Sequence, residues 1–530
     1  MNKEYLMIYA AALKYYQMGK YNEAEKLMPR LRNVLPDWPR TRLLEAYIKR
    51  GEKDYVAEVD ELESMLKVMG LYTASDITPM GRARRDKESL SFAAEAWSMK
   101  GSAETMLYRP RDAVFSFRRS VLLEPDISQK LVEMSNAIFA ANYAKDYSAV
   151  EFQTLYAQYR ELLSLTIKPM PPVFYSHDKL RIGFLSASLR RHPVAYFLWP
   201  LLHYHDHDKY LMYCYQANGN SDVVTKLLMR DTDKWRNISD MDDKRVAEVI
   251  RSDQIDILID LDGHTSGNRL PVLEYRPATL QMSGIGYMNS TGMRNVDYFI
   301  SDTSCGRDTD VNDSYFTERL MVLPQTHLCY APLIKMPEVN YDIGENIVFG
   351  SFNNFSKVTD EMLGIWAKIL ERAPQSTLFL KSRHFDNEKM RSFALKRMDK
   401  QGIDPSRVKL EGFSDDYLAE YNHVDIALDT YPYTGGMTTV EALYMGVPVI
   451  TRYGKRHGTC FGLSILKNCG LEELAADDAA SYIERAVSLA HDRKLLCGLH
   501  STIRGMMKSS PLMDGKRYAE AMQNQFDERI

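Results

Sequence analysis

The sequence predicts an α-helical repeat domain followed by two α/β domains, each with a parallel sheet. Residues 1 to about 165 show apolar residues at helical spacing and no convincing strand. Prolines then cluster in Thr166–Asp178, TIKPMPPVFYSHD, as expected of a linker. From Leu180 onward, short apolar runs alternate with helical stretches, a pattern typical of parallel strands connected by helices.

The composition bounds the class of protein. A chain of 530 residues is long enough for two to four domains with sizeable cores. Its net charge of -4 argues against a general nucleic-acid binder, which needs a basic face. None of the six cysteines forms a CxxC pair, so the spacing suggests neither a zinc site nor a disulfide framework, and we expect reduced thiols. We find no signal peptide and no apolar run of membrane-spanning length, and we expect a cytoplasmic protein.

Two places in the N-terminal domain share a pattern typical of tetratricopeptide repeats. The first has Tyr15, Gly19, Tyr21, Ala24 and Pro36, and the second has Trp97, Gly101, Ala113, Phe117 and Pro125. Small residues stand where paired helices cross, and a proline closes the second helix. Residues 37–70 are a candidate for a degenerate middle copy. Such repeats stack into a solenoid whose concave face binds extended peptides, whereas the alternative is a plain helical bundle.

Five apolar runs predict the strands of the first α/β domain. These runs are Leu180–Ser186, Leu211–Gln216, Ile255–Leu261, Leu280–Ile285 and Tyr298–Asp302. Asp243–Ser252 is predicted to be a helix between the second and third of them.

A second α/β domain is predicted to begin near Ile347. Its first strands are expected at Ile347–Ser351, Ser376–Lys381 and Val408–Glu411, with helices at Thr359–Arg372 and Asp386–Gln401. The last helix, roughly Pro511–Glu528, is amphipathic enough to pack across one or both domains. We therefore divide the chain into repeats (1–165), a linker (166–179), two α/β lobes (180–340 and 341–510) and a C-terminal helix (511–530).

The stretch Ile426–Thr451 predicts a strand, a glycine turn, a helix and a strand. The turn contains Gly435 and Gly436, and the helix begins at Met437. A helix N-terminus that follows glycines offers N–H groups and the positive end of a dipole to a phosphate. Neither GxGxxG nor a GK[ST] loop is present, so the motif indicates a phosphate-bearing ligand of another kind, or a βαβ unit without a ligand.

Several polar side chains are predicted to follow strands, where ligands of doubly wound sheets bind. His192 could anchor an anionic ligand or act as a base, unless it is an ordinary surface histidine. For His264, the alternative is an ordinary histidine in a turn. Lys357 could neutralise a leaving diphosphate, unless it is an ordinary solvated lysine. Asp260 and Asp262 form a DxD, but Asp260 should point into the sheet, which argues against a metal site.

Five ordered blocks resemble the tetratricopeptide-linked protein O-glycosyltransferases, which include the O-GlcNAc transferases and the SPINDLY proteins. The blocks are LRIGFLSASLRRHPVAYF, LIDLDGHTSGNRLPVLEYRPATLQMSGIGYMNSTGMRNVDYFISD, LPQTHLCY, FGSFNNFSKVTDEMLGIWAKIL and ALDTYPYTGGMTTVEALYMGVPVIT. They cover roughly residues 180–470. The chain has no room for the long insertion of the animal enzymes, so it looks bacterial or SPINDLY-like.

The resemblance implies a GT-B fold, with two Rossmann-like lobes facing a cleft that holds a nucleotide sugar. It also implies inverting transfer of a sugar to Ser or Thr without a catalytic metal or cofactor. The expected donor is UDP-GlcNAc, and the expected partner is an acceptor protein held by the repeats and the cleft.

The same resemblance suggests roles for individual residues. It makes His192 and Lys357 the catalytic candidates, and it places Asn354 near the nucleotide. The further candidates for nucleotide-sugar binding are Gly435, Gly436, Thr438, Thr439, Glu441 and Tyr417. The candidates on the acceptor side are His264, Tyr287 and Thr291.

Four positions depart from the family pattern. Met288 replaces a proline, Met437 a common threonine, Tyr417 a histidine near the base, and Cys460 a frequent arginine. These departures leave two alternatives to GlcNAc transfer. One keeps the fold and changes the donor or acceptor, as in an O-fucosyl- or a glucosyltransferase. The other is a peptide-binding scaffold with an inactive transferase lobe.

Overall fold

The structure of the protein, a computed structural model, describes residues 3–35, 38–73, 77–78, 85–340 and 344–530. The chain forms two compact units. The first comprises residues 1–144 and 386–394, and the second comprises residues 145–385 and 395–530. No helix in the described residues is long and apolar enough to cross a membrane.

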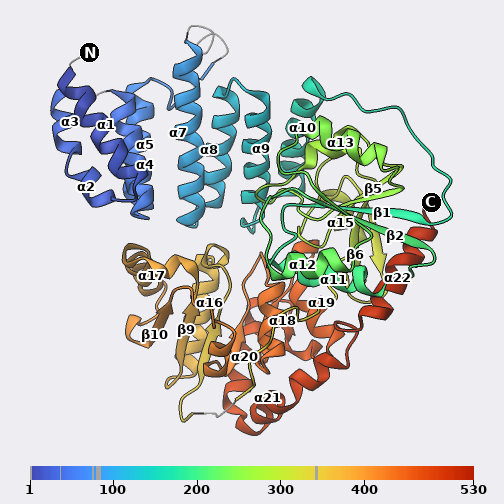
Figure 1. Ribbon diagram of the computed structural model, residues 1–530. Helices are drawn as coiled ribbons and strands as arrows, with labels where there is room; N and C mark the ends of the chain where they lie inside the picture. The colour runs from blue at the N-terminus through green and yellow to red at the C-terminus, as the bar shows by residue number, and fades with distance from the viewer. Residues whose placement is uncertain (1–2, 36–37, 74–76, 79–84, 341–343) are drawn as a thin grey trace. The chain divides into compact units, whose positions relative to one another are not determined.

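Helices alone make up the N-terminal part of the first unit, as the sequence predicted for the described residues (Figure 1). They are α1 (Lys3–Gln17), α2 (Tyr21–Glu25), α3 (Met28–Val34), α4 (Pro39–Gly51), α5 (Tyr55–Val68), α7 (Lys87–Met106), α8 (Pro110–Leu123) and α9 (Ile127–Ala141). Aspartate side chains cap three of these helices: Asp54 on α5, Asp86 on α7 and Asp126 on α9.

The predicted second repeat corresponds to the pair α7 and α8. A Cβ atom at Gly101 would lie 2.9 Å from the ring of Phe117, so only glycine allows the two helices this approach. Ala113 on α8 is fully buried, and Trp97 on α7 donates from Nε1 to the carbonyl of Leu71 at 3.2 Å. The small residues therefore stand at the helix crossing, as predicted, while Pro36 of the first copy lies outside the described residues.

Helix α10 (Ala149–Thr166) opens the second unit and begins with a capping box formed by Ser148 and Glu151. We assigned this segment to the repeats, yet its contacts group it with the α/β lobes. Arg160 donates to the carbonyl of Gly292 at 2.6 Å, and Gln153 donates to the carbonyl of Ser314 at 3.2 Å. The division of the chain that we drew from sequence remains a prediction.

The first lobe contains a seven-stranded parallel sheet in the order β3-β2-β1-β4-β5-β6-β7. Its strands are β1 (Leu180–Ser186), β2 (Tyr210–Gln216), β3 (Lys234–Asn237), β4 (Ile257–Asp260), β5 (Leu280–Ser283), β6 (Tyr298–Asp302) and β7 (Arg319–Leu323). Its helices are α11 (Pro193–Tyr204), α12 (Val223–Arg230), α13 (Asp243–Ser252), α14 (Leu270–Glu274) and α15 (Thr309–Tyr315). Strands β3 and β7 were not predicted, because few of their side chains are buried.

The second lobe contains a six-stranded parallel sheet in the order β10-β9-β8-β11-β12-β13. Its strands are β8 (Val348–Ser351), β9 (Thr377–Lys381), β10 (Val408–Glu411), β11 (Ile426–Leu428), β12 (Val449–Arg452) and β13 (Ala475–Ala476). The α-helices among them are α16 (Asp360–Arg372), α17 (Glu388–Lys400), α18 (Met437–Tyr444) and α19 (Phe461–Asn468). Short 3-10 turns cover 355–357, 383–386, 405–407, 419–423, 457–459 and 472–474.

Both sheets have the doubly wound order, in which the first strand of the lobe has neighbours on both sides. Strand β1 pairs with β2 and β4, and β8 pairs with β9 and β11. The loops after these strands diverge to opposite faces, which opens a crevice at the carboxyl ends of the strands. The fold thus indicates one ligand place per lobe, next to β1 and next to β8.

Three helices close the chain: α20 (Ala479–His491), α21 (Arg493–Lys508) and α22 (Gly515–Asp527). Helix α21 lies on the second lobe, where it packs on α18 and Arg504 donates to the carbonyl of Tyr444. Helix α22 packs on α11 of the first lobe, and Tyr210 of β2 donates to Asp527 at 2.7 Å. The end of the chain therefore contacts both lobes.

Candidate active site

A cavity of about 410 Å³ lies between the two lobes of the second unit. It is lined by Arg191, His192, Pro193, Tyr196, Phe352, Lys381, Ser382, Arg383, Gly412, Phe413, Tyr417, Met437, Thr438 and Glu441. Four of the site residues that we proposed from sequence are among them: His192, Tyr417, Thr438 and Glu441. The loops after β1, β8, β9 and β10 all contribute, as expected for the carboxyl ends of parallel strands.

His192 is the N-cap residue of α11, directly before Pro193. Its Nδ1 atom accepts a hydrogen bond from the backbone N–H of Val194 at 3.4 Å. An imidazole that accepts at Nδ1 carries its proton on Nε2. Burial, aided by the charge of Arg190, lowers the pKa of His192 to about 4, so the ring is neutral near pH 7. In this arrangement, His192 is a hydrogen-bond donor through Nε2 rather than a base.

Lys357 ends the 3-10 turn after β8 and lies beside the glycine turn of the second lobe. Its Nζ atom is 3.4 Å from the carbonyl oxygen of Thr434 and 3.8 Å from the centre of the Tyr433 ring. Burial lowers the pKa of Lys357 to about 8, although the carboxylate of Asp429 opposes this shift. Lys357 does not line the cavity, but it is a desolvated cation beside the glycine turn that leads into α18, and the first residues of α18 do line it.

Asn353, which the sequence analysis passed over, connects three loops of the second lobe. Its Nδ2 atom donates to Asp429 at the end of β11 at 3.3 Å, and its Oδ1 atom accepts from Thr438 of α18 at 3.0 Å. The adjacent Asn354, which we proposed near the nucleotide, is exposed, and its side chain caps the amide of Ser356 at 3.0 Å. The two asparagines therefore occupy different environments.

The glycine turn positions α18 with its N-terminus at the cavity. The N–H of Gly435 donates to Asp429 at 2.7 Å, so this amide is not available to a ligand. Gly436 is the N-cap residue, and no side chain caps the helix. Thr439, in the first turn of α18, is buried, and its hydroxyl has no hydrogen-bond partner. The first turn of α18 thus presents N–H groups and the positive end of the helix dipole, as predicted.

Tyr417 and Glu441 form a hydrogen-bonded pair in the cavity wall, with the tyrosine hydroxyl as the donor. Burial raises the pKa of Glu441 to about 7, against the opposing effects of the hydrogen bond from Tyr417 and the charge of Arg191. The pKa of Tyr417 is also raised, first by burial and then by the carboxylate of Glu441. A carboxyl group of this kind can accept hydrogen bonds from ligand hydroxyls.

Three cationic side chains of the cavity wall complete its electrostatics: Arg191, Lys381 and Arg383. None of the three was among the site residues that we proposed from sequence. Lys381 is buried and pairs with Glu420 at 2.8 Å, whereas Arg383 is exposed and lies over the ring of Phe413 at 4.5 Å. Lys381 and Arg383 stand at and just after the end of β9, so the rule that selected His192 would also have found them.

The residues that we placed on the acceptor side lie in the interior of the first lobe and do not line the cavity. His264, Tyr287 and Thr291 are each at most 2% exposed. His264 contacts the carbonyl of Thr291 through Nε2 at 2.9 Å, and the backbone N–H of Thr291 donates to Glu318 at 2.8 Å. These contacts hold loop 284–293 in place, and a role toward an acceptor stays a prediction.

The DxD sequence is part of the interior of the first lobe. Asp260 accepts from the hydroxyl of Ser283 at 2.7 Å and from the amide of Gly263 at 2.8 Å. Asp262 accepts from the hydroxyl of Ser186 at 2.8 Å and from the amide of Ala187 at 2.6 Å. Both carboxyl groups order the carboxyl ends of β1 and β4, in agreement with the inward orientation that we expected of Asp260.

Comparison with known proteins identifies the class to which this fold and cavity belong. The model for glycosyl transferase family 41 matches residues 168–336 and 331–522. A SPINDLY protein of Petunia hybrida, described as a probable UDP-N-acetylglucosamine–peptide N-acetylglucosaminyltransferase, is 36% identical over 66% of this chain and 38% of its own length. The rice SPINDLY protein, with the same description, is 34% identical over 78% of this chain and 45% of its own length.

Among solved structures, a mutant O-GlcNAc transferase of Thermobaculum terrenum is 27% identical to the chain. The match has a TM-score of 0.81 and covers 100% of this chain and 98% of the other. The chain thus spans less than half the length of the plant relatives but nearly all of this bacterial structure. The fold is that of two-lobed GT-B transferases preceded by helical repeats. The chain belongs to glycosyl transferase family 41.

Proposed function

We propose that the chain transfers a sugar from a nucleoside diphosphate sugar to Ser or Thr hydroxyls of an acceptor protein, with UDP-GlcNAc as the donor. The observation that carries the proposal is the cavity between the lobes. It combines the uncapped N-terminus of α18, three cationic side chains and the neutral donor His192. Such an arrangement suits a diphosphate and its sugar. The descriptions of the SPINDLY relatives support the choice of GlcNAc and of a peptide acceptor.

In the proposed reaction, the acceptor oxygen attacks the anomeric carbon as the bond from that carbon to the diphosphate oxygen breaks. The diphosphate leaves with the electron pair, and the hydroxyl proton passes to solvent or to the departing phosphate. Attack opposite the leaving group inverts the anomeric configuration. Lys357 and the amides of α18 stabilise the charge that develops on the diphosphate. Donation from His192 Nε2 orients the sugar or the acceptor oxygen.

The distribution of side chains in the cavity suggests how the nucleoside is held. Phe413 is half exposed, with 51% of its surface accessible, and it carries the guanidinium of Arg383 on its ring. An exposed aromatic ring at the wall of this cavity is a stacking platform for a nucleobase. Glu441, fixed by Tyr417, is an acceptor for ribose hydroxyls.

Thermal unfolding with UDP, with GDP and without nucleotide tests the proposal first. A nucleotide at about a hundred times its Kd adds roughly 2.7 kcal/mol to the stability of the lobe that binds it. We expect a rise in Tm with UDP and none with GDP. A rise with GDP alone would replace the donor by a GDP sugar such as GDP-fucose, and no rise with either would support the inactive scaffold.

A transfer assay then tests the reaction itself. We expect mass spectrometry to find a mass increase of one N-acetylhexosamine on serine or threonine peptides after incubation with UDP-GlcNAc. The anomeric configuration of the product, read by NMR, tests inversion. Independence of a catalytic metal predicts that added Mg²⁺ or Mn²⁺ leaves turnover unchanged.

A further inference from the structure

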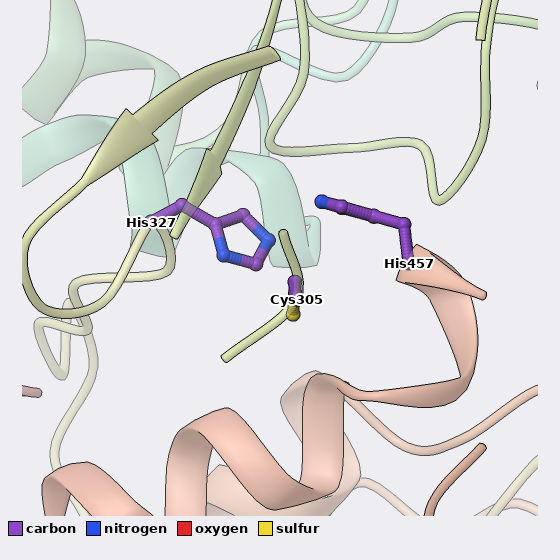
Figure 2. A group of neighbouring side chains, drawn as sticks. All are labelled: Cys305, His327 and His457. Atoms are coloured by element: carbon purple, nitrogen blue, oxygen red, sulfur yellow. The ribbon is translucent and has the colours of Figure 1, made fainter. Parts of the chain in front are cut away.

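A second group of reactive side chains lies between the lobes, apart from the residues that line the cavity. Cys305, His327 and His457 are fully buried or nearly so, and each offers one ligand atom within 4.8 Å of the others (Figure 2). Cys305 follows β6 and His327 follows β7 in the first lobe, whereas His457 begins the 3-10 turn after β12 in the second. All three belong to the same compact unit.

The hydrogen bonds of the two histidines leave the same nitrogen of each ring for another partner. His327 Nδ1 bonds to the carboxylate of Asp302, and His457 Nδ1 lies 3.2 Å from the carbonyl oxygen of Met288. Both partners accept only, so the Nδ1 atoms carry protons and the Nε2 atoms carry lone pairs. His457 Nε2 is buried and has no hydrogen-bond partner. A buried lone pair without a partner is costly, and in Figure 2 the His457 ring is directed towards His327.

The surroundings of the cluster are those of metal-binding histidines. Such histidines usually donate their second ring nitrogen to a carboxylate or a carbonyl, which fixes the tautomer and the ring. Asp302 also accepts from the amide of Cys305 at 2.9 Å and from Ser464 of α19 at 2.7 Å. One carboxylate therefore orients both ligands of the first lobe and connects them to the second lobe.

We propose that Cys305, His327 and His457 bind a divalent zinc ion that joins the two lobes. Thiolate and imidazole are the ligands that zinc prefers in tetrahedral sites. Bond lengths of 2.0–2.3 Å require neighbouring ligand atoms about 3.5 Å apart, so the cluster needs to contract by about 1 Å. Cys305 loses its proton to solvent as the zinc–sulfur bond forms.

The site has no counterpart in the sequence analysis, which found no zinc spacing. Its ligands come from three separate loops, so no short sequence motif such as CxxC contains them. Its place is also distinct from that of the proposed reaction, because none of the three residues lines the cavity. The metal would act on the lobes as a cross-link and would take no part in sugar transfer.

Metal analysis of the full-length protein tests the proposal. Purified protein is incubated with zinc chloride, passed through a desalting column and analysed by mass spectrometry of elements. We expect about one zinc per chain, retained against a weak chelator. In the cobalt(II)-loaded protein, we expect the near-ultraviolet charge-transfer band of a cobalt–thiolate bond and the visible bands of tetrahedral cobalt. Absence of stoichiometric zinc and of both sets of bands from the wild-type protein would overturn the proposal.

Two cysteine variants make the test specific. Cys305→Ser should lose the thiolate band and most of the zinc, while Cys469→Ser, which removes another buried free cysteine, should keep both. Cys305→His retains a ligand atom and should keep tetrahedral cobalt bands without the thiolate band. Chelation should lower the Tm of the wild type and of Cys469→Ser but not that of Cys305→Ser. Zinc that stays stoichiometric in Cys305→Ser would assign the metal to other residues.

Discussion

The hydroxyl of Thr438 donates a 3.0 Å hydrogen bond to the side-chain carbonyl of Asn353, which connects the start of α18 to the end of β8. The same asparagine donates to the buried carboxylate of Asp429, which in turn accepts from the amide of Gly435. These bonds fix the helix N-terminus against the two strands at the switch point of the second sheet. The proposed diphosphate site is thus held in place by Asn353 and Asp429, which do not line the cavity themselves.

We predict that Asn353→Ala weakens UDP binding about tenfold and lowers the free energy of unfolding by about 1–3 kcal/mol. The substitution leaves the Thr438 hydroxyl without its acceptor and removes one of several hydrogen bonds to the buried carboxylate of Asp429, and the desolvation of such groups is not fully recovered. Isothermal titration calorimetry and urea unfolding measure the two effects.

The neighbouring Asn354 provides the matched control. Its side chain caps only the amide of Ser356 and is exposed, so Asn354→Ala should cost about 1 kcal/mol or less and leave UDP affinity within about twofold. A larger loss of affinity in Asn354→Ala than in Asn353→Ala would restore the assignment that we drew from sequence.

A second prediction concerns the pH dependence of nucleotide binding. Burial lowers the pKa of Lys357 to about 8, so the cation that we propose to stabilise the diphosphate disappears as the pH rises through that value. We expect the affinity for UDP to be nearly constant from pH 7 to 8 and to fall up to about tenfold per unit above it. Phosphate groups are already ionised over this range, because their second pKa is about 6.

Lys357→Met separates this effect from other titrations. The variant should bind UDP more weakly at pH 7 and show no fall above pH 8, and its turnover should drop far more than its affinity. Equal losses of turnover and affinity would remove the leaving-group role. An unchanged pH profile in the variant would assign the titration to another group.

A third prediction follows from the pair of Tyr417 and Glu441. Burial raises the pKa of Glu441 to about 7, above its value of about 4.3 in an unfolded chain. Between these values the folded state holds a proton that the unfolded state has lost, so stability falls as the pH rises through this window. The shift corresponds to a loss of about 4 kcal/mol, complete above pH 7.

Glu441→Gln removes this carboxyl group and its titration. Relative to the wild type, the variant should gain stability progressively between about pH 4.3 and 7 and keep a constant advantage above pH 7. Urea unfolding at pH 5, 6, 7 and 8 measures the difference. Nucleotide affinity should fall in the same variant, because an amide NH2 group replaces one of the two carboxyl oxygens that could accept from ribose hydroxyls. A stability difference that does not change with pH would contradict the raised pKa.

Hydrophobic runs and turn residues were sufficient to predict the α/β fold. Strands β1, β6 and β10 begin and end at the predicted residues, because each is an apolar or alternating run between polar loops. Strand β3, with its sequence KWRN, and the two-residue β13 were not predicted, because short edge strands carry little hydrophobic signal.

Only part of the candidate site could be predicted from the sequence. Sequence reasoning selected His192 by the rule that ligands follow strands, and it selected Thr438 and Glu441 by the family resemblance; all three line the cavity. It could not distinguish Asn353 from Asn354, because a difference of one residue in a tight turn sends the side chains to different environments. The cluster of Cys305, His327 and His457 could not be predicted from the sequence, because its members meet only when the two lobes pack together.

A fourth prediction tests the helix crossing in the repeats. A methyl group at position 101 would lie 2.9 Å from the ring of Phe117, closer than normal contacts allow. We expect Gly101→Ala to lower the free energy of unfolding by about 1–2 kcal/mol, because overpacking exceeds the gain in helix propensity. Gly498→Ala in α21 is the control, since its methyl group would meet nothing within 4 Å and should stabilise the protein by up to about 1 kcal/mol.

The last prediction concerns the role of His192. A general base with an ordinary histidine pKa would produce an acidic limb near pH 6.5 in the profile of kcat/KM. The structure instead holds the ring neutral, with a pKa of about 4 and with Nδ1 accepting from Val194, so Nε2–H can only donate. We therefore expect the pH profile of kcat/KM between pH 5.5 and 7 to have the same shape in the wild type and in His192→Gln. His192→Gln, which keeps a donor, should retain more activity than His192→Ala. An acidic limb near pH 6.5 that disappears in both variants would show that His192 acts as the base.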